Sequence, residues 1–210
     1  MNAQTEALRL DGAAGVIEAA RDQPPPEVPH RGTAILAHPH PLFGGTMDNK
    51  VVQTLARAFV QCGWTTVRFN FRGVGASAGA HDEGRGETED MRAVIAQTAA
   101  QGPLALAGFS FGSFVASRVL EGLWTERPPE KIVFVGTAVS RLKVVALPPE
   151  AHLRTLVVHG EHDDTVPLAD VMDWARPQTL PVTVVPGGGH FFHGQLPLLK
   201  GLVVRHLLSP

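Results

Sequence analysis

A serine between two glycines is the feature of this sequence that most clearly predicts chemistry. Gly108, Ser110 and Gly112 form a G-x-S-x-G motif, which follows an apolar run and precedes a segment with helical spacing. In that context the serine sits on a sharp strand-to-helix turn, where a Cβ at either glycine would collide with neighbouring backbone. The N-terminus of the helix offers free N–H groups to a negatively charged oxygen. We therefore predict Ser110 as a nucleophile and the backbone N–H of Phe111 as a donor to an oxyanion.

Four more motifs accompany this serine, and the set is more specific than the serine motif alone. The five motifs are HPHPLFGGTMDN at 38–49, NFRGVG at 70–75, GFSFG at 108–112, HGEHDDTVP at 159–167 and GGGH at 187–190. Through them the chain resembles the α/β-hydrolase superfamily, and within it the small serine hydrolases without a lid that are described as dienelactone-hydrolase-like. Dienelactone hydrolases have a cysteine as nucleophile, whereas Ser110 stands in that place here. The dienelactone substrate is therefore not carried over.

The acid of a triad is expected between the serine and the histidine, because this fold places them in the order Ser, Asp or Glu, His. Two adjacent carboxylates, Asp163 and Asp164, follow the apolar run 154–159. The spacing G-x-x-D-x-x-V-P of the resembled family aligns its acid with Asp163. We predict Asp163 as the acid that orients the base. Asp164 remains the alternative, because only one of an adjacent pair can point at the histidine.

Three histidines follow Asp163 and are candidates for the base. His190 ends a glycine-rich loop after an apolar run, His193 is expected on the first turn of the next helix, and His206 lies within that helix. A base belongs on a loop that follows a strand, so its position favours His190.

A second donor to the oxyanion usually comes from the loop after an early strand, which here begins at residue 38. Pro39 and Pro41 have no N–H, which leaves His40 and Leu42 as donors. We predict the N–H of Leu42, and His40 stays open as the alternative.

Two other kinds of site compete with this prediction. His38 and His40 form an H-x-H pair of the kind that opens metal-dependent hydrolase sites, but those sites sit in (β/α)₈ barrels of typically about 250 residues, and this chain has 210. The NFRGVG motif lacks the G-x-G-x-x-G spacing of a dinucleotide site, and no G-K-[ST] motif is present. We therefore expect no metal and no cofactor.

Short apolar runs alternate with longer amphipathic segments, and these elements must position the candidate residues. The predicted strands are 33–37, 64–69, 104–107, 131–135, 154–159 and 182–185, and the predicted helices are 48–62, 87–100, 111–123, 168–175 and 196–208. Near-continuous apolar strands that alternate with helices indicate a parallel sheet covered on both faces. The predicted fold class is α/β, a mostly parallel, doubly wound sheet of the α/β-hydrolase type.

Three segments depart from this alternation. In the first thirty residues, two short strands around Asp11-Gly12 predict an antiparallel edge hairpin, followed by a Pro-rich loop. Residues 136–153 are enough for a connection with one helical turn and too few for a lid. The acidic, Gly-rich run 81–90 predicts a solvated loop that ends in a helix start. We expect one domain over residues 1–210.

Composition excludes several classes of function. Lys and Arg number 18 and Asp and Glu 20, so there is no basic surplus to bind nucleic acid. No apolar run approaches the roughly 18 residues of a membrane span, and no signal peptide is visible. The single cysteine, Cys62, excludes an internal disulfide. We expect a soluble, cytoplasmic protein without nucleic-acid or membrane partners, and nothing here indicates its oligomeric state.

Together these observations predict a carboxylesterase-type serine hydrolase that cleaves small soluble esters through an acyl-enzyme. The predicted triad and oxyanion donors are Ser110, Asp163, His190, Phe111 and Leu42. A thioesterase, a lactonase or a peptidase would use the same triad. Two alternatives of another class remain: a non-catalytic binding protein of the α/β-hydrolase type, and a metal-dependent hydrolase that uses His38 and His40.

Overall fold

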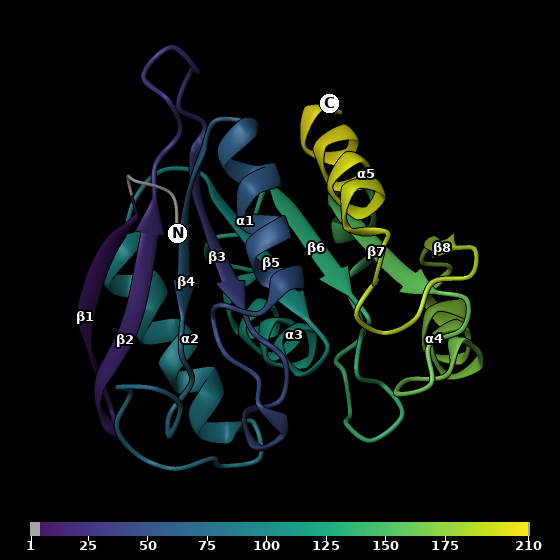
Figure 1. The fold of residues 1–210 in the computed structure, drawn as a ribbon, viewed down its shortest axis with the longest axis horizontal. Helices are drawn as coiled ribbons and strands as arrows, with labels where there is room; N and C mark the ends of the chain where they lie inside the picture. The colour runs from purple at the N-terminus through teal and green to yellow at the C-terminus, as the bar shows by residue number, and fades with distance from the viewer. Residues whose placement is uncertain (1–4, 210) are drawn as a thin grey trace.

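A computed structural model describes residues 5–209, and their strands form one sheet in the order β1-β2-β4-β3-β5-β6-β7-β8 (Figure 1). The strands are β1 (Glu6–Gly12), β2 (Gly15–Asp22), β3 (Gly32–Ala37), β4 (Trp64–Phe69), β5 (Leu104–Phe109), β6 (Lys131–Val135), β7 (Thr155–Gly160) and β8 (Val182–Val185). β1 pairs with β2 and β2 with β4 in antiparallel fashion, and all other pairs are parallel. Residues 1–4 and 210 of the predicted domain lie outside the described residues.

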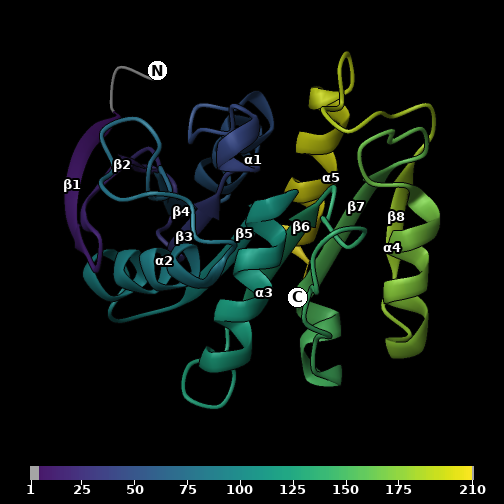
Figure 2. The same cartoon turned by 90° about the horizontal axis from the view of Figure 1, so that it is seen from below.

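Helices cover both faces of this sheet. They are α1 (Lys50–Gln61), α2 (Arg85–Thr98), α3 (Phe111–Leu123), α4 (Leu168–Ala175) and α5 (Leu196–Leu208), with short 3₁₀ turns η1 (Pro41–Phe43), η2 (Pro149–Arg154) and η3 (Arg176–Gln178). Figures 1 and 2 show α1 and α5 on one face and α2, α3 and α4 on the other, and each face buries its own apolar cluster. The predicted α/β fold with an N-terminal hairpin and no lid is confirmed.

The central strands β5 and β6 are almost entirely apolar, which made them easy to recognise in the sequence. Every residue of β5 and β6 is buried, because helices cover both faces of the sheet there. β1, at the edge of the sheet, instead alternates between exposed and half-buried positions. The connection from β6 to β7 contains only η2 as regular structure, so no lid is inserted there.

The crevice that can hold a ligand follows from the strand order. β3 pairs with β4 on one side and with β5 on the other. Along the chain, α1 connects β3 to β4 and covers one face of the sheet. The next helix, α2, connects β4 to β5 and covers the opposite face (Figure 2). Loops that leave the carboxyl ends of β3 and β5 therefore diverge, and a crevice opens at this switch point.

The turn of the N-terminal hairpin differs from the prediction. Gly12 pairs with Gly15 across the hairpin, so the turn consists of Ala13 and Ala14 rather than Asp11-Gly12. The positive φ of 114° belongs to Gly15 and not to Gly12. The Asp-Gly signal located the hairpin correctly, but the ladder continues past it to Gly12.

The acidic run 81–90 also differs from the prediction of a solvated loop. α2 already begins at Arg85, and the side chains of Glu87 and Asp90 are buried. Glu87 accepts hydrogen bonds from the N–H groups of Asp82 and Gly84, and Asp90 pairs with Arg72 at 2.8 Å. These carboxylates can be buried in the protein because each of them accepts hydrogen bonds from nearby donors.

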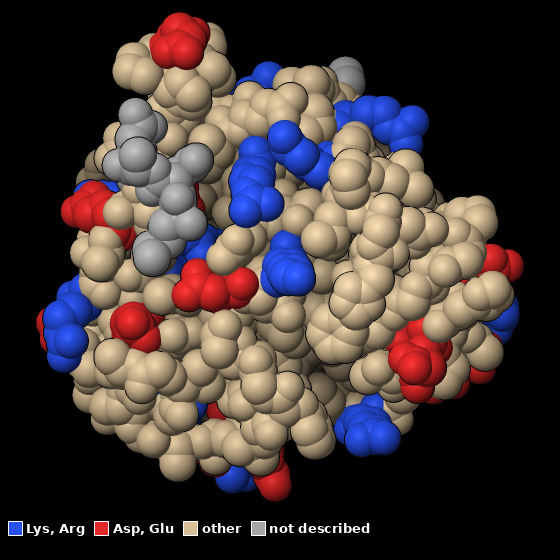
Figure 3. Space-filling model, in the orientation of Figure 1, with Lys and Arg blue, Asp and Glu red and all other residues tan. Residues whose placement is uncertain are grey.

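The face drawn in Figure 3 shows no single dominant charge, because basic and acidic side chains are interspersed there among wide uncharged areas. No helix within residues 5–209 is long and apolar enough to cross a membrane.

Candidate active site

The backbone at Ser110 makes a sharp turn between β5 and α3. Ser110 has φ of 55° and ψ of −116° and is the N-cap residue of α3. A Cβ on Gly112 would lie 2.2 Å from the carbonyl oxygen of Ala37, and one on Gly108 would lie 2.4 Å from the carbonyl of Gly112. The prediction that only glycine fits on both sides of this serine is confirmed.

Three side chains from separate loops meet at the carboxyl edge of the sheet. Nε2 of His190 lies 3.1 Å from Oγ of Ser110, and Nδ1 of His190 lies 2.7 Å from Oδ2 of Asp163. They follow β5, β7 and β8, whose carboxyl ends lie along this edge. This linear arrangement allows a proton to pass from the hydroxyl to the imidazole while the carboxylate holds the other ring nitrogen.

Asp163 is held as an ion by hydrogen bonds. Its Oδ1 accepts the N–H groups of Thr165 at 3.0 Å and Val166 at 2.7 Å, while His190 occupies Oδ2. Burial alone would raise the pKa of this carboxyl, but the contacts with His190 and Val166 hold the pKa of Asp163 below its usual value. The neighbouring Asp164 is exposed and bonds only to the Thr165 hydroxyl, so Asp163 is the carboxylate that faces the base.

The ring of His190 packs against two aromatic side chains that also contact each other. Its centroid lies 4.9 Å from that of Phe109 and 5.1 Å from that of Phe191. The other two candidate bases lie elsewhere. His193 is exposed and precedes α5 instead of standing on its first turn, and His206 bonds to the carbonyl of Arg154.

Two backbone N–H groups beside Ser110 are free to bind a negative oxygen. Within the described chain, the N–H groups of Phe111 and His40 donate to no protein acceptor. The predicted second donor, the N–H of Leu42, instead donates to Nδ1 of His40 at 3.2 Å. The N–H of Leu42 is therefore already engaged, whereas the alternative, His40, has a free donor.

The cleft around these groups has a volume of about 720 Å³. Its lining residues come from the loops that follow β3, β5, β6, β7 and β8: Pro39, His40, Phe43, Gly44, Gly45, Asn49, Ser110, Phe111, Ala138, Ser140, Arg141, Leu142, Asp164, Thr165, Val166, His190 and Phe191. Phe43, at 79% exposure, and Phe191, at 44%, are the exposed large apolar side chains among them. The cleft is therefore partly apolar and carries both a cation, Arg141, and an anion, Asp164.

The histidine pair that could serve a metal is arranged differently. Nδ1 of His38 donates to the carbonyl of Pro39 at 2.6 Å, and its Nε2 accepts the N–H of Phe71 at 3.0 Å. Burial lowers the pKa of His38 to about 4. Both of its ring nitrogens are engaged, and within residues 5–209 no group of three or more His, Cys, Asp or Glu side chains is placed to hold a metal ion.

Three residues near the cleft have contacts to the site that the sequence did not predict. His159 lies behind Asp163, with Nε2 2.8 Å from the carbonyl of Val166 and 3.4 Å from Oδ2 of Asp163. His81 and Glu87 lie beside His40, where His81 Nδ1 is 2.7 Å from Oε1 of Glu87. His159 opens the motif at 159–167 but had no predicted role in the triad, His81 carried no spacing signal, and Glu87 stood in a run whose composition indicated solvent exposure.

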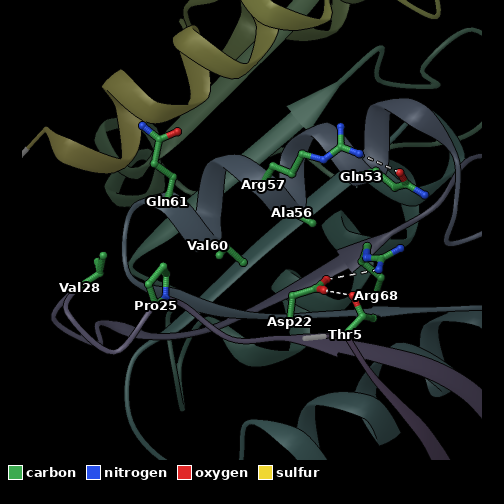
Figure 4. Close-up of a pocket in the computed structure, with 10 residues that line it drawn as sticks. All are labelled: Thr5, Asp22, Pro25, Val28, Gln53, Ala56, Arg57, Val60, Gln61 and Arg68. Atoms are coloured by element: carbon green, nitrogen blue, oxygen red, sulfur yellow. Dashed lines mark hydrogen bonds and ion pairs between the residues drawn. The ribbon is translucent and has the colours of Figure 1, made fainter. Parts of the chain in front are cut away.

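A second hollow of about 380 Å³ lies between α1 and the segment that follows β2. Figure 4 shows Asp22 and Arg68 pairing on its floor, with Arg57 and Gln53 of α1 above them. It shares no lining residue with the cleft at Ser110.

Comparisons with known proteins identify the family and agree with the fold. Residues 31–151 match the family described as "Serine aminopeptidase, S33". An α/β serine hydrolase without a lid from Xanthomonas campestris is 36% identical, with 100% of this chain and 99% of that chain covered and a TM-score of 0.87. An α/β serine hydrolase homologue from Coxiella burnetii is 37% identical over 97% of each chain, with a TM-score of 0.84. An uncharacterised protein of Rickettsia prowazekii (strain Madrid E) is 31% identical over an alignment of 180 residues that covers 78% of this chain and 73% of that protein.

Proposed function

The chain belongs to the α/β serine hydrolases, and from that premise we propose that it cleaves small carboxylic esters through an acyl-enzyme on Ser110. The observation that carries the proposal is the chain of contacts from Ser110 through His190 to Asp163, at 3.1 and 2.7 Å. It supplies the nucleophile, the base and the group that orients the base, which acyl transfer requires.

Acylation begins when the Ser110 hydroxyl attacks the ester carbonyl and His190 Nε2 accepts its proton. Asp163 keeps Nδ1 of His190 protonated and stabilises the imidazolium that forms. The carbonyl oxygen becomes negative, and the free N–H groups of Phe111 and His40 bind it. His190 then gives its proton to the departing alcohol as the C–O bond breaks, which leaves the acyl group on Ser110.

Deacylation repeats the same proton movements with water. His190 accepts a proton from a water molecule, whose oxygen attacks the acyl carbonyl, and the same two N–H groups hold the oxyanion. The proton then passes to Ser110 as the acid leaves. Each oxyanion donor of this kind typically contributes about 10²–10³ to kcat.

Esters are proposed ahead of amides because alcohols leave more readily than amines and the cleft is not closed by a lid. The described family names an aminopeptidase activity, and a peptide, a thioester or a lactone would form the same acyl-enzyme. We would therefore compare p-nitrophenyl acetate and butyrate with amino-acid p-nitroanilides at equal concentration. Faster turnover of the anilides would contradict the ester assignment and leave the serine mechanism in place.

The serine mechanism itself is tested by labelling the purified protein with a fluorophosphonate and mapping the adduct by mass spectrometry. We expect one adduct on Ser110, and none after substitution by alanine. Ser113 of α3, whose hydroxyl donates to the carbonyl of Gly108 in β5, supplies the matched control. The Ser113→Ala variant should still be labelled on Ser110. A folded protein with no adduct would favour a non-catalytic binding protein, and loss of turnover with EDTA would favour the metal-dependent alternative. The cytoplasmic location and the absence of nucleic-acid and membrane partners remain predictions.

A further inference from the structure

A second histidine–carboxylate pair, His81 and Glu87, lies against His40 and Phe111 and takes no part in the proposed proton transfers. The Glu87 side chain is fully buried at the start of α2. Its Oε2 accepts the N–H of Gly84 at 2.8 Å, and its Oε1 accepts that of Asp82 at 2.9 Å. Nδ1 of His81 lies 2.7 Å from Oε1, at ion-pair distance, with the ring N–H turned off the line to the oxygen.

The ring of His81 contacts both residues that present the free N–H groups. Its centroid lies 4.7 Å from that of His40 and 5.5 Å from that of Phe111. The rings of His40 and Phe111 also contact one another, at 4.8 Å. One side chain thus packs against the loop after β3 and against the start of α3, the two separate elements from which the oxyanion donors come.

Packing of His81 against the His40 ring affects the position of the His40 N–H. Its Nδ1 accepts the N–H of Leu42, and its carbonyl accepts those of Phe43 and Gly45, both at 3.1 Å. Burial and the neighbouring His81 lower the pKa of His40, so Nδ1 is free to accept near neutral pH. Because the ring and the carbonyl of His40 organise this turn, a displacement of the ring also displaces its N–H.

The loop that carries His81 is fixed to α2. Arg72, in the loop that leads to His81, donates from Nε and Nη2 to the buried carboxylate of Asp90 at 3.0 and 2.8 Å. Glu87 and Asp90 therefore hold the loop to the same helix at two points. Charge-assisted contacts to buried carboxylates are short and geometrically demanding, which suits a positioning role.

We propose that His81, paired with Glu87, is a positioning residue that sets the spacing of the two oxyanion-binding amides, those of His40 and Phe111. This inference rests on the proposed function, since those amides act only if an acyl-enzyme forms. Misplacement of a group by about 1 Å can cost about 10² in rate. Removal of the His81 ring is expected to affect the transition state, where the oxygen is negative, more than the bound substrate.

The test measures kcat and KM for a p-nitrophenyl ester, and the affinity for a trifluoromethyl ketone, whose serine adduct places its oxygen between the two amides. His81→Ala is expected to lower kcat by about 10–100-fold, to weaken ketone binding by a similar factor, and to leave KM within about threefold. His81→Phe, which returns a ring to the same contacts, is expected to recover most of kcat. Glu87→Gln is expected to lower kcat several-fold. Glu121→Gln, a change of the same kind at an exposed position of α3, is the control and keeps the wild-type values.

Thermal melting shows which variants fold, and Glu87→Gln replaces His81→Ala as the test if the alanine variant does not fold. A folded His81→Ala, or Glu87→Gln in its place, that keeps the wild-type kcat and ketone affinity overturns the inference, and so does a loss that appears in KM alone. In both cases the wild-type protein is active, so the proposed function stands. A wild-type protein that neither hydrolyses esters nor reacts at Ser110 contradicts the proposed function and this inference with it.

Discussion

Ser110 occupies a backbone conformation that residues other than glycine seldom adopt, with φ of 55°. Such a conformation costs about 1–3 kcal/mol and persists only where the surroundings enforce it. Here β5 ends one residue earlier and α3 begins one residue later, so both neighbours of Ser110 are fixed. Because this turn places Oγ within reach of His190, the strain at one residue serves the proposed chemistry.

The two adjacent aspartates allow a residue-scale prediction with an internal control. Asp163→Asn replaces an acceptor by an amide that cannot hold Nδ1 of His190 protonated, and kcat is expected to fall by about 10⁴-fold. Asp164→Asn changes an exposed side chain that does not contact His190, so kcat is expected to stay within about threefold. Steady-state kinetics on one ester checks both. Equal losses in the two variants would move the orienting role away from Asp163.

Sequence reasoning at this scale succeeded where chain order and motif spacing specify a residue, and failed where a hydrogen bond decides. The G-x-S-x-G spacing and the glycine-rich loop before His190 pointed to side chains that the structure brings together. Leu42 was chosen over His40, but only the folded turn reveals that the N–H of Leu42 donates to His40. Burial of Glu87 likewise depends on the N–H groups of Asp82 and Gly84, which reach its carboxylate only in the folded start of α2.

Contact between α3 and β3 depends on the absence of a side chain at Gly112, which yields an element-scale prediction. Gly112→Ala would place a Cβ 2.2 Å from the carbonyl oxygen of Ala37, so the helix must move away from the strand. We expect a loss of about 1–3 kcal/mol in the free energy of unfolding, as for other overpacked sites. Gly201→Ala in α5, where nothing lies within 4 Å, is expected to gain about 0.5–1 kcal/mol. Urea unfolding of both variants checks this, and a neutral Gly112→Ala would contradict the close approach.

A hydrogen bond between His38, which follows β3, and Phe71, which follows β4, allows a prediction of how stability depends on pH. Its Nε2 accepts the N–H of Phe71, and burial lowers its pKa from 6.5 to about 4. Between those two pH values the unfolded chain binds more protons than the folded one, so stability is complete above pH 6.5 and falls as the pH approaches 4. His206, whose pKa burial also lowers to about 4, acts in the same direction.

The measurement is the melting temperature of the wild type, His38→Gln and His206→Gln at several pH values from 7 to 4. Each variant is expected to melt lower than the wild type at pH 7, and to lose less on acidification. The carboxyl of Asp163, whose pKa lies below its usual value, contributes stability above about pH 4 that is lost only as the pH falls further. A wild-type curve that is flat between pH 6.5 and 4 would contradict the assignment of neutral, buried histidines.

The elements themselves were largely predictable because burial on both faces leaves a strong apolar signal. The predicted strand at 131–135 and helix at 111–123 have the bounds that the structure gives to β6 and α3. The hairpin turn was misplaced because ladder pairing, and not the Asp-Gly dipeptide, decides where β1 ends. The 3₁₀ turn η1 was not predicted, since it is held by contacts to the carbonyl and ring of His40.

At the scale of the whole molecule, the loops at the carboxyl edge of the sheet determine access to Ser110. No helical insertion covers the cleft, since the β6–β7 connection contains only η2 and the β8–α5 connection contains no helix at all within the described chain. Phe43 and Phe191 stand exposed at the cleft, where a lid would otherwise cover them. The apolar surface around the site is therefore exposed to water.

This permanently open cleft predicts the absence of interfacial activation. In hydrolases with a lid, a lipid surface stabilises the open form, so the rate rises when the substrate exceeds its solubility limit; here no closed form exists from which an interface could release the site. The rate on a short-chain ester such as tributyrin is expected to follow a simple hyperbola through that limit. Esters that remain in solution should be better substrates than emulsified long-chain ones.

The measurement is the initial rate across the solubility limit, with a parallel series in which detergent disperses the droplets. A sharp rise in rate at the limit that detergent abolishes would mean that a loop around the cleft, with η1 and its exposed Phe43 the first candidate, closes the site in solution.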